Sequence, residues 1–347
     1  MAHETGAGAR IAFFGPLTLL AREIRTALEG RAFPIADVKL FDEGAEGTLG
    51  EFAGEAVVVT RPEENAGIDI AFMCGSARET VPYLDWPSRD GFVAIDLSGA
   101  ARERAQIPIV HAEINPGDIV RGANGKSGGC PAQVIAAPHA VSHNLSTIGA
   151  SAARAGRLQR IEAVSLRPAS DLGQEAVDEL YRQTLGLLNF SDVPKEVFGR
   201  QLAFNVVPST SVSRSRAEGF DERVREETRR ILGLAPGSVC LASSFVPVFH
   251  GHALFVTLTF REKVDHDALK NVMGAMRGLR VVEDGDDFSP VDLAGTEDIA
   301  VMDLAPDGKH PERATLWCFC DNLKGGAALN AVRIAERVTD IARKAKG

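Results

Sequence analysis

The sequence predicts an α/β protein of two domains, of which the first contains a doubly wound, mostly parallel sheet. The chain has 347 residues, more than the roughly 250–300 residues at which a single hydrophobic core stops growing. Short runs rich in valine and isoleucine alternate with helical patterns in the first third, as in parallel sheets. Beyond residue 130 the strands become longer, which favours an α+β domain. These observations place the domains at 1–130 and 131–323.

The elements of the first third follow from its apolar runs. Strands are expected at 10–15, 37–42, 56–60, 69–75, 91–98 and 107–115. Apolar residues at helical spacing predict helices over 19–30 and 78–86. In a doubly wound sheet, a nucleotide binds at the turn after the first strand.

The remaining elements are mixed in type. Helices are expected at 131–155 with an interruption at Pro138, and at 174–188, 265–276 and 327–345. Two long strands within 239–260 meet near Gly251, and a further strand covers 314–322. This arrangement indicates an antiparallel or mixed second sheet.

Composition excludes several classes of protein. Apolar residues make up 45% and charged residues 24% of the chain, as in ordinary globular proteins. The net charge of −9 disfavours nucleic acid or an anionic membrane as a partner. Five cysteines without a C-x-x-C pair favour reduced thiols and a cytoplasmic location. Neither a signal peptide nor an apolar run of about 18 residues is present in the sequence.

Cys130, within the segment SGGCPAQVI, has two open interpretations. The adjacent glycines leave room for a ligand, and Pro131 suits the first position of a helix. If residues 132–137 continue that helix, its dipole would stabilise a thiolate at Cys130. The alternative is a packing residue, since free cysteines are among the most buried residue types.

Four segments in order resemble the aspartate-β-semialdehyde dehydrogenase family, and within it the Usg-type paralogues. They are SLRPASDLGQEAVDEL, FGRQLAFNVVP, VPVFHGH and DNLKGGAALNAVRIAE. The resemblance implies a Rossmann-like first domain, completed by the closing helix at 324–347, and a second domain that carries catalysis and dimerisation. It also implies a homodimer, NADP or NAD as cofactor, and a small substrate of the acyl phosphate or semialdehyde class.

The same resemblance implies a mechanism and its residues. A cysteine thiolate attacks aspartyl phosphate, a histidine handles the proton, and NADPH delivers hydride to the thioester. Cys130 is the cysteine nearest the nucleophile's place, although counting back from Pro138 gives Ser127 instead. His252 matches the acid/base, a role that suits imidazole because it titrates near neutral pH. Without the resemblance, His252 would be interpreted as a histidine satisfied at a strand turn.

Three arginines are candidates for substrate binding. Arg102 falls where the family holds the substrate phosphate, and its planar fork suits an oxyanion. Arg223 replaces a family lysine; alone, it would indicate a solvated helix face. Arg167 stands where the family has a glutamine, and the family's carboxylate-binding arginine is replaced by Phe245. An apolar ring cannot pair with a carboxylate, so Arg167 is a candidate for that contact.

The expected cofactor-binding residues match the family pattern at some positions and depart from it at others. After the first strand, Gly15 is the one glycine that remains of the family's glycine-rich turn. The side chains at the other positions of this turn would obstruct close approach of a pyrophosphate. Asp42 and Glu43 would repel a 2′-phosphate and suit the ribose of NAD. Residues that match the nicotinamide side are Ser170, Gly173 and Asn322. NADP is therefore expected to bind no better than NAD.

Two functions remain open at this stage. One is an active semialdehyde dehydrogenase with an altered substrate, and the other is a catalytically impaired paralogue with a binding, scaffolding or regulatory role. No metal site is predicted, because the pairs His139 with His143 and His250 with His252 lack a further ligand at recognisable spacing.

Overall fold

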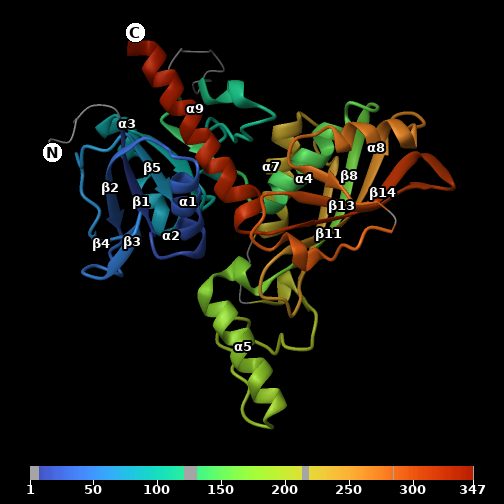
Figure 1. Cartoon of the computed structure of the whole chain (residues 1–347), viewed down its shortest axis with the longest axis horizontal. Coiled ribbons are helices and arrows are strands. Elements are labelled where there is room, and N and C mark those ends of the chain that lie inside the picture. The colour runs from blue at the N-terminus through green and yellow to red at the C-terminus, as the bar shows by residue number, and fades with distance from the viewer. Residues whose placement is uncertain (1–7, 121–130, 213–218, 284, 347) are drawn as a thin grey trace. The chain divides into compact units, whose positions relative to one another are not determined.

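The computed structural model describes residues 8–120, 131–212, 219–283 and 285–346. The chain divides into two compact units (Figure 1). Met1–His139 and Ala327–Gly347 form the first, and Ala140–Gly326 forms the second. In the described part of the chain, no helix has both the length and the apolar character needed to cross a membrane.

The first unit contains a seven-stranded sheet in the order β3-β4-β2-β1-β5-β6-β7. Its strands are β1 (Ala9–Phe14), β2 (Ile35–Phe41), β3 (Leu49–Phe52), β4 (Glu55–Thr60), β5 (Ile70–Met73), β6 (Val93–Asp96) and β7 (Val134–Ala136). Strand β1 pairs in parallel with β2 on one side and β5 on the other. The doubly wound sheet is confirmed, and the short antiparallel strand β3 adds an edge that the sequence did not predict.

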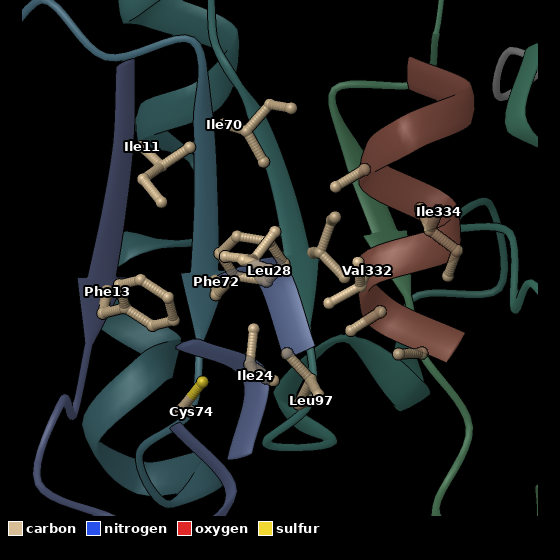
Figure 2. Packing of buried hydrophobic residues seen from close by; sticks show 14 of the residues in the cluster. Ile11, Phe13, Ile24, Leu28, Ile70, Phe72, Cys74, Leu97, Val332 and Ile334 are labelled. Atoms are coloured by element: carbon tan, nitrogen blue, oxygen red, sulfur yellow. The ribbon is translucent and has the colours of Figure 1, made fainter. Parts of the chain in front are cut away.

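Helices α1 (Leu19–Gly30) and α9 (Leu329–Lys346) pack on this sheet and share one core with it. Figure 2 shows Phe13 and Phe72 of the strands near Leu28 of α1 and Val332 of α9. The Thr18 hydroxyl caps α1 by accepting a hydrogen bond from Ala21 N at 3.2 Å.

The helix predicted over 78–86 is broken into short pieces. They are α2 (Ala77–Thr80), a 3-10 turn at Val81–Tyr83 and α3 (Trp86–Asp90). Pro82 and Pro87 lie in the first turns of the second and third pieces. Proline cannot donate a helical hydrogen bond, so each one starts a new segment instead of continuing the last.

The helix predicted from residue 131 is wrong. Val134–Ala136 form β7, which pairs in parallel with β6, and α4 (Ala140–Ala152) begins only after Pro138. A short buried run with two β-branched residues fits either element, and here sheet pairing decides. The expected helix N-cap at Cys130 therefore loses its support, because a strand follows Pro131. Cys130 and Ser127 themselves lie outside the described residues.

The second unit contains a mixed seven-stranded sheet in the order β12-β13-β14-β11-β8-β10-β9. Its strands are β8 (Leu158–Arg167), β9 (Val207–Pro208), β10 (Val239–Phe245), β11 (His252–Phe260), β12 (Leu279–Val281), β13 (Ile299–Asp307) and β14 (His310–Cys320). The two strands expected within 239–260 are present, but β8 lies between them, parallel to β10 and antiparallel to β11.

Helices α4, α7 (Phe220–Leu232) and α8 (His266–Gly274) pack against this second sheet and share its core. Helix α5 (Gln174–Leu188) has the predicted bounds and packs in a separate apolar cluster with the segment around Phe198. Apolar side chains fill most of the covered face of the sheet, but polar side chains replace them at one end.

Candidate active site

Strand register gathers the candidate residues at that polar end of the second sheet. Arg167 ends β8 and pairs with Phe245 at the end of β10. His252 begins β11, next to β8, and pairs with Cys320 at the end of β14. All four residues are buried. The site therefore follows from where four neighbouring strands begin or end.

A chain of two ion pairs connects Arg167 with His252 through Asp171. The Arg167 Nε donates to Asp171 Oδ2 at 2.8 Å, and His252 Nε2 lies 2.9 Å from Asp171 Oδ1. Asp171 lies four residues after Arg167, in the 3-10 turn Ala169–Leu172 that follows β8. The exposed fractions of the three side chains are 3%, 4% and 0% in chain order. Water therefore screens these charges very little.

The Arg167 guanidinium lies between two aromatic rings. Its central carbon is 3.5 Å from the centre of the Phe220 ring and 4.3 Å from that of Phe245. Cation–π contact offsets part of the cost of burying this charge. Burial lowers the pKa of Arg167, while the carboxylates of Asp171 and Asp221 act in the opposite direction. Its Nε is bonded to Asp171 and is not available to a substrate anion in this arrangement.

The surroundings of the His252 imidazole favour its charged form. Burial disfavours the imidazolium, but the Asp171 carboxylate and the Cys320 side chain outweigh burial and raise the pKa of His252 to about 9. The Cys320 Sγ accepts a hydrogen bond from Asn144 Nδ2 at 2.7 Å. Cys318 and Cys320 are both buried in the core of the second unit.

The predicted nicotinamide-side residues join the turn that precedes His252. The Asn322 Oδ1 accepts from Gly251 N at 2.8 Å, and Asn322 Nδ2 donates to Ser170 Oγ at 3.0 Å. Gly173 caps α5 with a φ of 91°, which favours glycine. The structure thus brings five predicted residues together, namely Arg167, Ser170, Gly173, His252 and Asn322.

Arg223 belongs to a hydrogen-bonded line beside this cluster. Its Nε donates to Glu227 Oε1 at 2.6 Å, and Ser142 Oγ donates to Glu227 Oε2 at 2.6 Å. Arg223 lies on α7, and the same helix supplies Phe220, whose ring contacts the Arg167 guanidinium. The alternative interpretation of Arg223, a residue on a solvated helix face, does not hold, because its side chain is only 12% exposed.

The first unit holds the other candidates. Gly15 follows β1 with a φ of 72°, and a Cβ there would lie 2.6 Å from Gly75 N. Arg102 is exposed in the 3-10 turn Ala100–Glu103. Asp42 accepts from Gly44 N at 2.9 Å, and Glu43 accepts from Tyr83 Oη at 2.8 Å. Both carboxylates therefore have partners within this unit.

Sequence reasoning missed Asp171 and Cys320 as neighbours of His252, and Asn144 as a neighbour of Cys320. The spacing of Asp171 to Arg167, four residues on within SLRPASD, was a usable signal for a local ion pair. No local signal identifies Asn144 or Cys320. Their contacts depend on the packing of α4 and on the register of β14 with β11.

Comparison with known proteins settles the family. Residues 10–122 match the family model described as semialdehyde dehydrogenase, NAD binding domain. Residues 150–324 match the one described as semialdehyde dehydrogenase, dimerisation domain. The chain belongs to the semialdehyde dehydrogenase family. The semialdehyde dehydrogenase resemblance, the fold class and a nicotinamide-binding type of domain are thereby confirmed.

Relatives of this semialdehyde dehydrogenase family member span nearly its whole length. It is 28% identical to an aspartate-semialdehyde dehydrogenase of Prochlorococcus marinus, over 94% of both chains. It is also 28% identical to a USG-1 protein homolog of Azotobacter vinelandii, over 94% of this chain and 96% of that one. A crystal structure of aspartate semialdehyde dehydrogenase II from Vibrio cholerae has a TM-score of 0.85 and 25% identity, covering 96% and 99% of the two chains.

Proposed function

We propose that this chain is a nicotinamide-dependent semialdehyde dehydrogenase that interconverts an acyl phosphate and a semialdehyde through a cysteine thioester. The observation that carries this proposal is the buried His252, held by Asp171 and adjoining the Ser170–Asn322 pair. The names of the relatives support the substrate class. One related structure is titled as a complex of aspartate semialdehyde dehydrogenase II with ASA.

Each predicted residue has a defined task in this proposal. Cys130 is the predicted nucleophile, whose thiolate displaces phosphate from the acyl phosphate and forms the thioester. Reduction of the thioester releases the aldehyde and regenerates the thiolate. His252 donates a proton toward the negative charge that develops on the carbonyl oxygen. Arg102 and Arg223 are the predicted anion-binding residues, and the Arg167 charge is committed to Asp171.

A nicotinamide dinucleotide supplies the hydride when bound. The predicted residues for it are Gly15, Ser170, Gly173 and Asn322, and the backbone of the first unit at Gly15 fits a turn of this kind. Asp42 and Glu43 present carboxylates where a 2′-phosphate would be repelled, so we propose that NADP binds no better than NAD. Separate calorimetric titrations test this, and clearly tighter binding of NADP would contradict it.

We further propose a homodimer formed through the second unit. On the sheet face opposite the one shared with α4, α7 and α8, Phe255 pairs in register with Val164 and Trp317. Val164 is 46% and Phe255 37% exposed, an apolar area that a second copy would cover. Light scattering should give a dimer, and Phe255→Glu should shift it toward monomer. A stable wild-type monomer at micromolar concentration would refute the dimer.

Activity is tested with aspartate semialdehyde, phosphate and either NAD or NADP. His252→Asn should lower kcat/KM by about 10²–10⁴-fold, as expected for loss of a general acid/base. His310→Asn is the matched control, because the His310 side chain is 54% exposed. Turnover within threefold of wild type in His252→Asn would remove His252 from the mechanism. Cofactor binding without any turnover would favour the impaired paralogue.

A further inference from the structure

We propose that Asp171, itself held by Arg167, is a positioning residue that keeps His252 protonated at neutral pH and fixes the orientation of its ring. His252 would then rest in the site as a proton donor and not as a general base. The role of that proton in the reaction rests on the proposed function. The protonation state of His252 does not depend on it.

The His252 Nε2 faces the Asp171 carboxylate. That atom lies 2.9 Å from Asp171 Oδ1, in a place where the His252 side chain is fully buried. Arg167 Nε binds the other oxygen of the same carboxylate at 2.8 Å. Asp171 is therefore held from two sides, between β8 and β11, and cannot turn away from His252 without leaving the Arg167 cation unpaired.

The groups that face this pair come from several elements. The 3-10 turn after β8 supplies Asp171, and β14 supplies Cys320, which interacts with His252. Arg167 of β8 is a cation in direct contact with Asp171. Helix α7 supplies Asp221, whose carboxylate acts on Arg167. Helix α4 contributes the neutral Asn144, bonded to Cys320. The direct contacts of His252 thus favour its positive form.

The position of the proton gives the two directions of the reaction different pH dependences. A protonated His252 can donate as soon as negative charge develops on a substrate oxygen, as in reduction of a thioester. Oxidation of the aldehyde requires His252 first to lose that proton against the attraction of Asp171. The reductive direction should therefore run at neutral pH, and the oxidative direction should require alkaline pH.

The imidazole titration can be followed by NMR with histidine labelled at the ring carbon. The chain has eight histidines, and His252→Asn identifies the signal of interest. We expect a pKa of about 9 in the wild type. Asp171→Asn should lower it by at least two pH units, because burial then acts without the carboxylate. Arg167→Gln should raise it, because Asp171 then loses its competing cation.

Opposite responses in the two variants distinguish this role from a merely structural one. Asp178→Asn is the control, since Asp178 is exposed and binds only Gln174 among the contacts described. If either single variant fails to fold, the double variant Arg167→Gln/Asp171→Asn removes both buried charges and should still show a His252 pKa below that of the wild type, because the carboxylate that favours the imidazolium is gone. The acid-donor limb of the pH profile of kcat should move with it.

Two results would overturn the proposal. One is a wild-type His252 that titrates near its ordinary value of about 6.5. The other is a shift of the His252 signal in the same direction in Asp171→Asn and Arg167→Gln. Because the titration needs no substrate, a chain with the expected pKa but no turnover would refute the proposed function alone.

Discussion

The two units each contain an arginine–aspartate pair, one at the surface and one in the interior. In the first unit, Arg10 binds Asp69 with two side-chain hydrogen bonds of 3.1 and 2.7 Å. In the second, Arg167 binds Asp171 at 2.8 Å. The side chains of the first pair are 50% and 45% exposed, and those of the second are 3% and 4% exposed. The chemical groups are the same, and the pairs differ in their number of hydrogen bonds and in their exposure to water.

That environment changes the sign of the effect on the guanidinium. Hydrogen bonding to Asp69 raises the pKa of Arg10, whereas burial lowers the pKa of Arg167. At the surface the charge is already favourable in water, and the partner adds little. In the interior the charge is costly and is retained only with a carboxylate, two aromatic rings and a serine hydroxyl around it. Asp171 of the buried pair also forms an ion pair with His252. Neither Arg10 nor Asp69 of the surface pair is a candidate site residue.

The largest expected effect comes from removing one charge of the buried pair. Asp171→Asn removes the carboxylate that is hydrogen-bonded to the buried Arg167 cation, and should lower the free energy of unfolding by about 3–5 kcal/mol. Chemical denaturation measures this, with Asp178→Asn as the exposed control. The double variant Arg167→Met/Asp171→Asn should be more stable than Asp171→Asn alone. A single variant as stable as wild type would show that Arg167 finds another partner.

The next effect is a dependence of stability on pH. The folded pKa of His252, about 9, lies above the unfolded value of about 6.5, so folding favours the protonated form. This contribution is fully present below about pH 6.5 and is lost as the pH rises through about 9, with a size of about 3 kcal/mol. Denaturation of wild type and His252→Gln at several pH values isolates it. Parallel curves for the two proteins would contradict it.

Sequence patterns predicted the elements whose formation depends on local signals. The bounds of α1 and α5 agree with the expected helices at 19–30 and 174–188, because both have amphipathic spacing and α1 has a threonine cap. Residues 134–136 were misassigned because three buried residues carry no periodicity of their own. Their strand form depends on β6, whose Ala94 pairs with Val134.

The candidate site also contains residues that the sequence predicted and residues that it did not. His252, Arg167, Ser170 and Asn322 were found through family-like segments, and the structure places them together. The partners that set the charge of His252 were not found. Asp171 becomes its neighbour only when β8 and β11 pair, and Cys320 only when β14 takes its register on β11. Contacts between strands far apart in sequence are a property of the fold, not of any one segment.

A smaller loss of stability is expected from a substitution at Gly15 in the first unit, where the backbone of Gly75 approaches closely and no charge is involved. A side chain at Gly15 would meet Gly75 N at 2.6 Å, with a φ of 72° that disfavours other residues. Gly15→Ala should cost about 1–3 kcal/mol. Gly47→Ala is the matched control, since Gly47 also has a positive φ, of 81°, but nothing within 4 Å. Equal costs at the two positions would show that backbone conformation, and not close approach, is what requires glycine at Gly15.

The smallest effect should come from the surface pair. Asp69→Asn removes the charge that faces Arg10 but keeps an oxygen able to accept from Arg10 N, a hydrogen bond of 2.8 Å in the wild type. We expect a loss of less than about 1 kcal/mol, because water solvates the freed guanidinium. That loss should shrink further in about 1 M salt, where exposed charges are screened within about 3 Å. The loss in Asp171→Asn should not respond to salt, because ions do not reach a buried pair. Equal salt dependence at Asp69 and Asp171 would show that the second pair is accessible to solvent, and would remove the low-dielectric argument for the charge on His252.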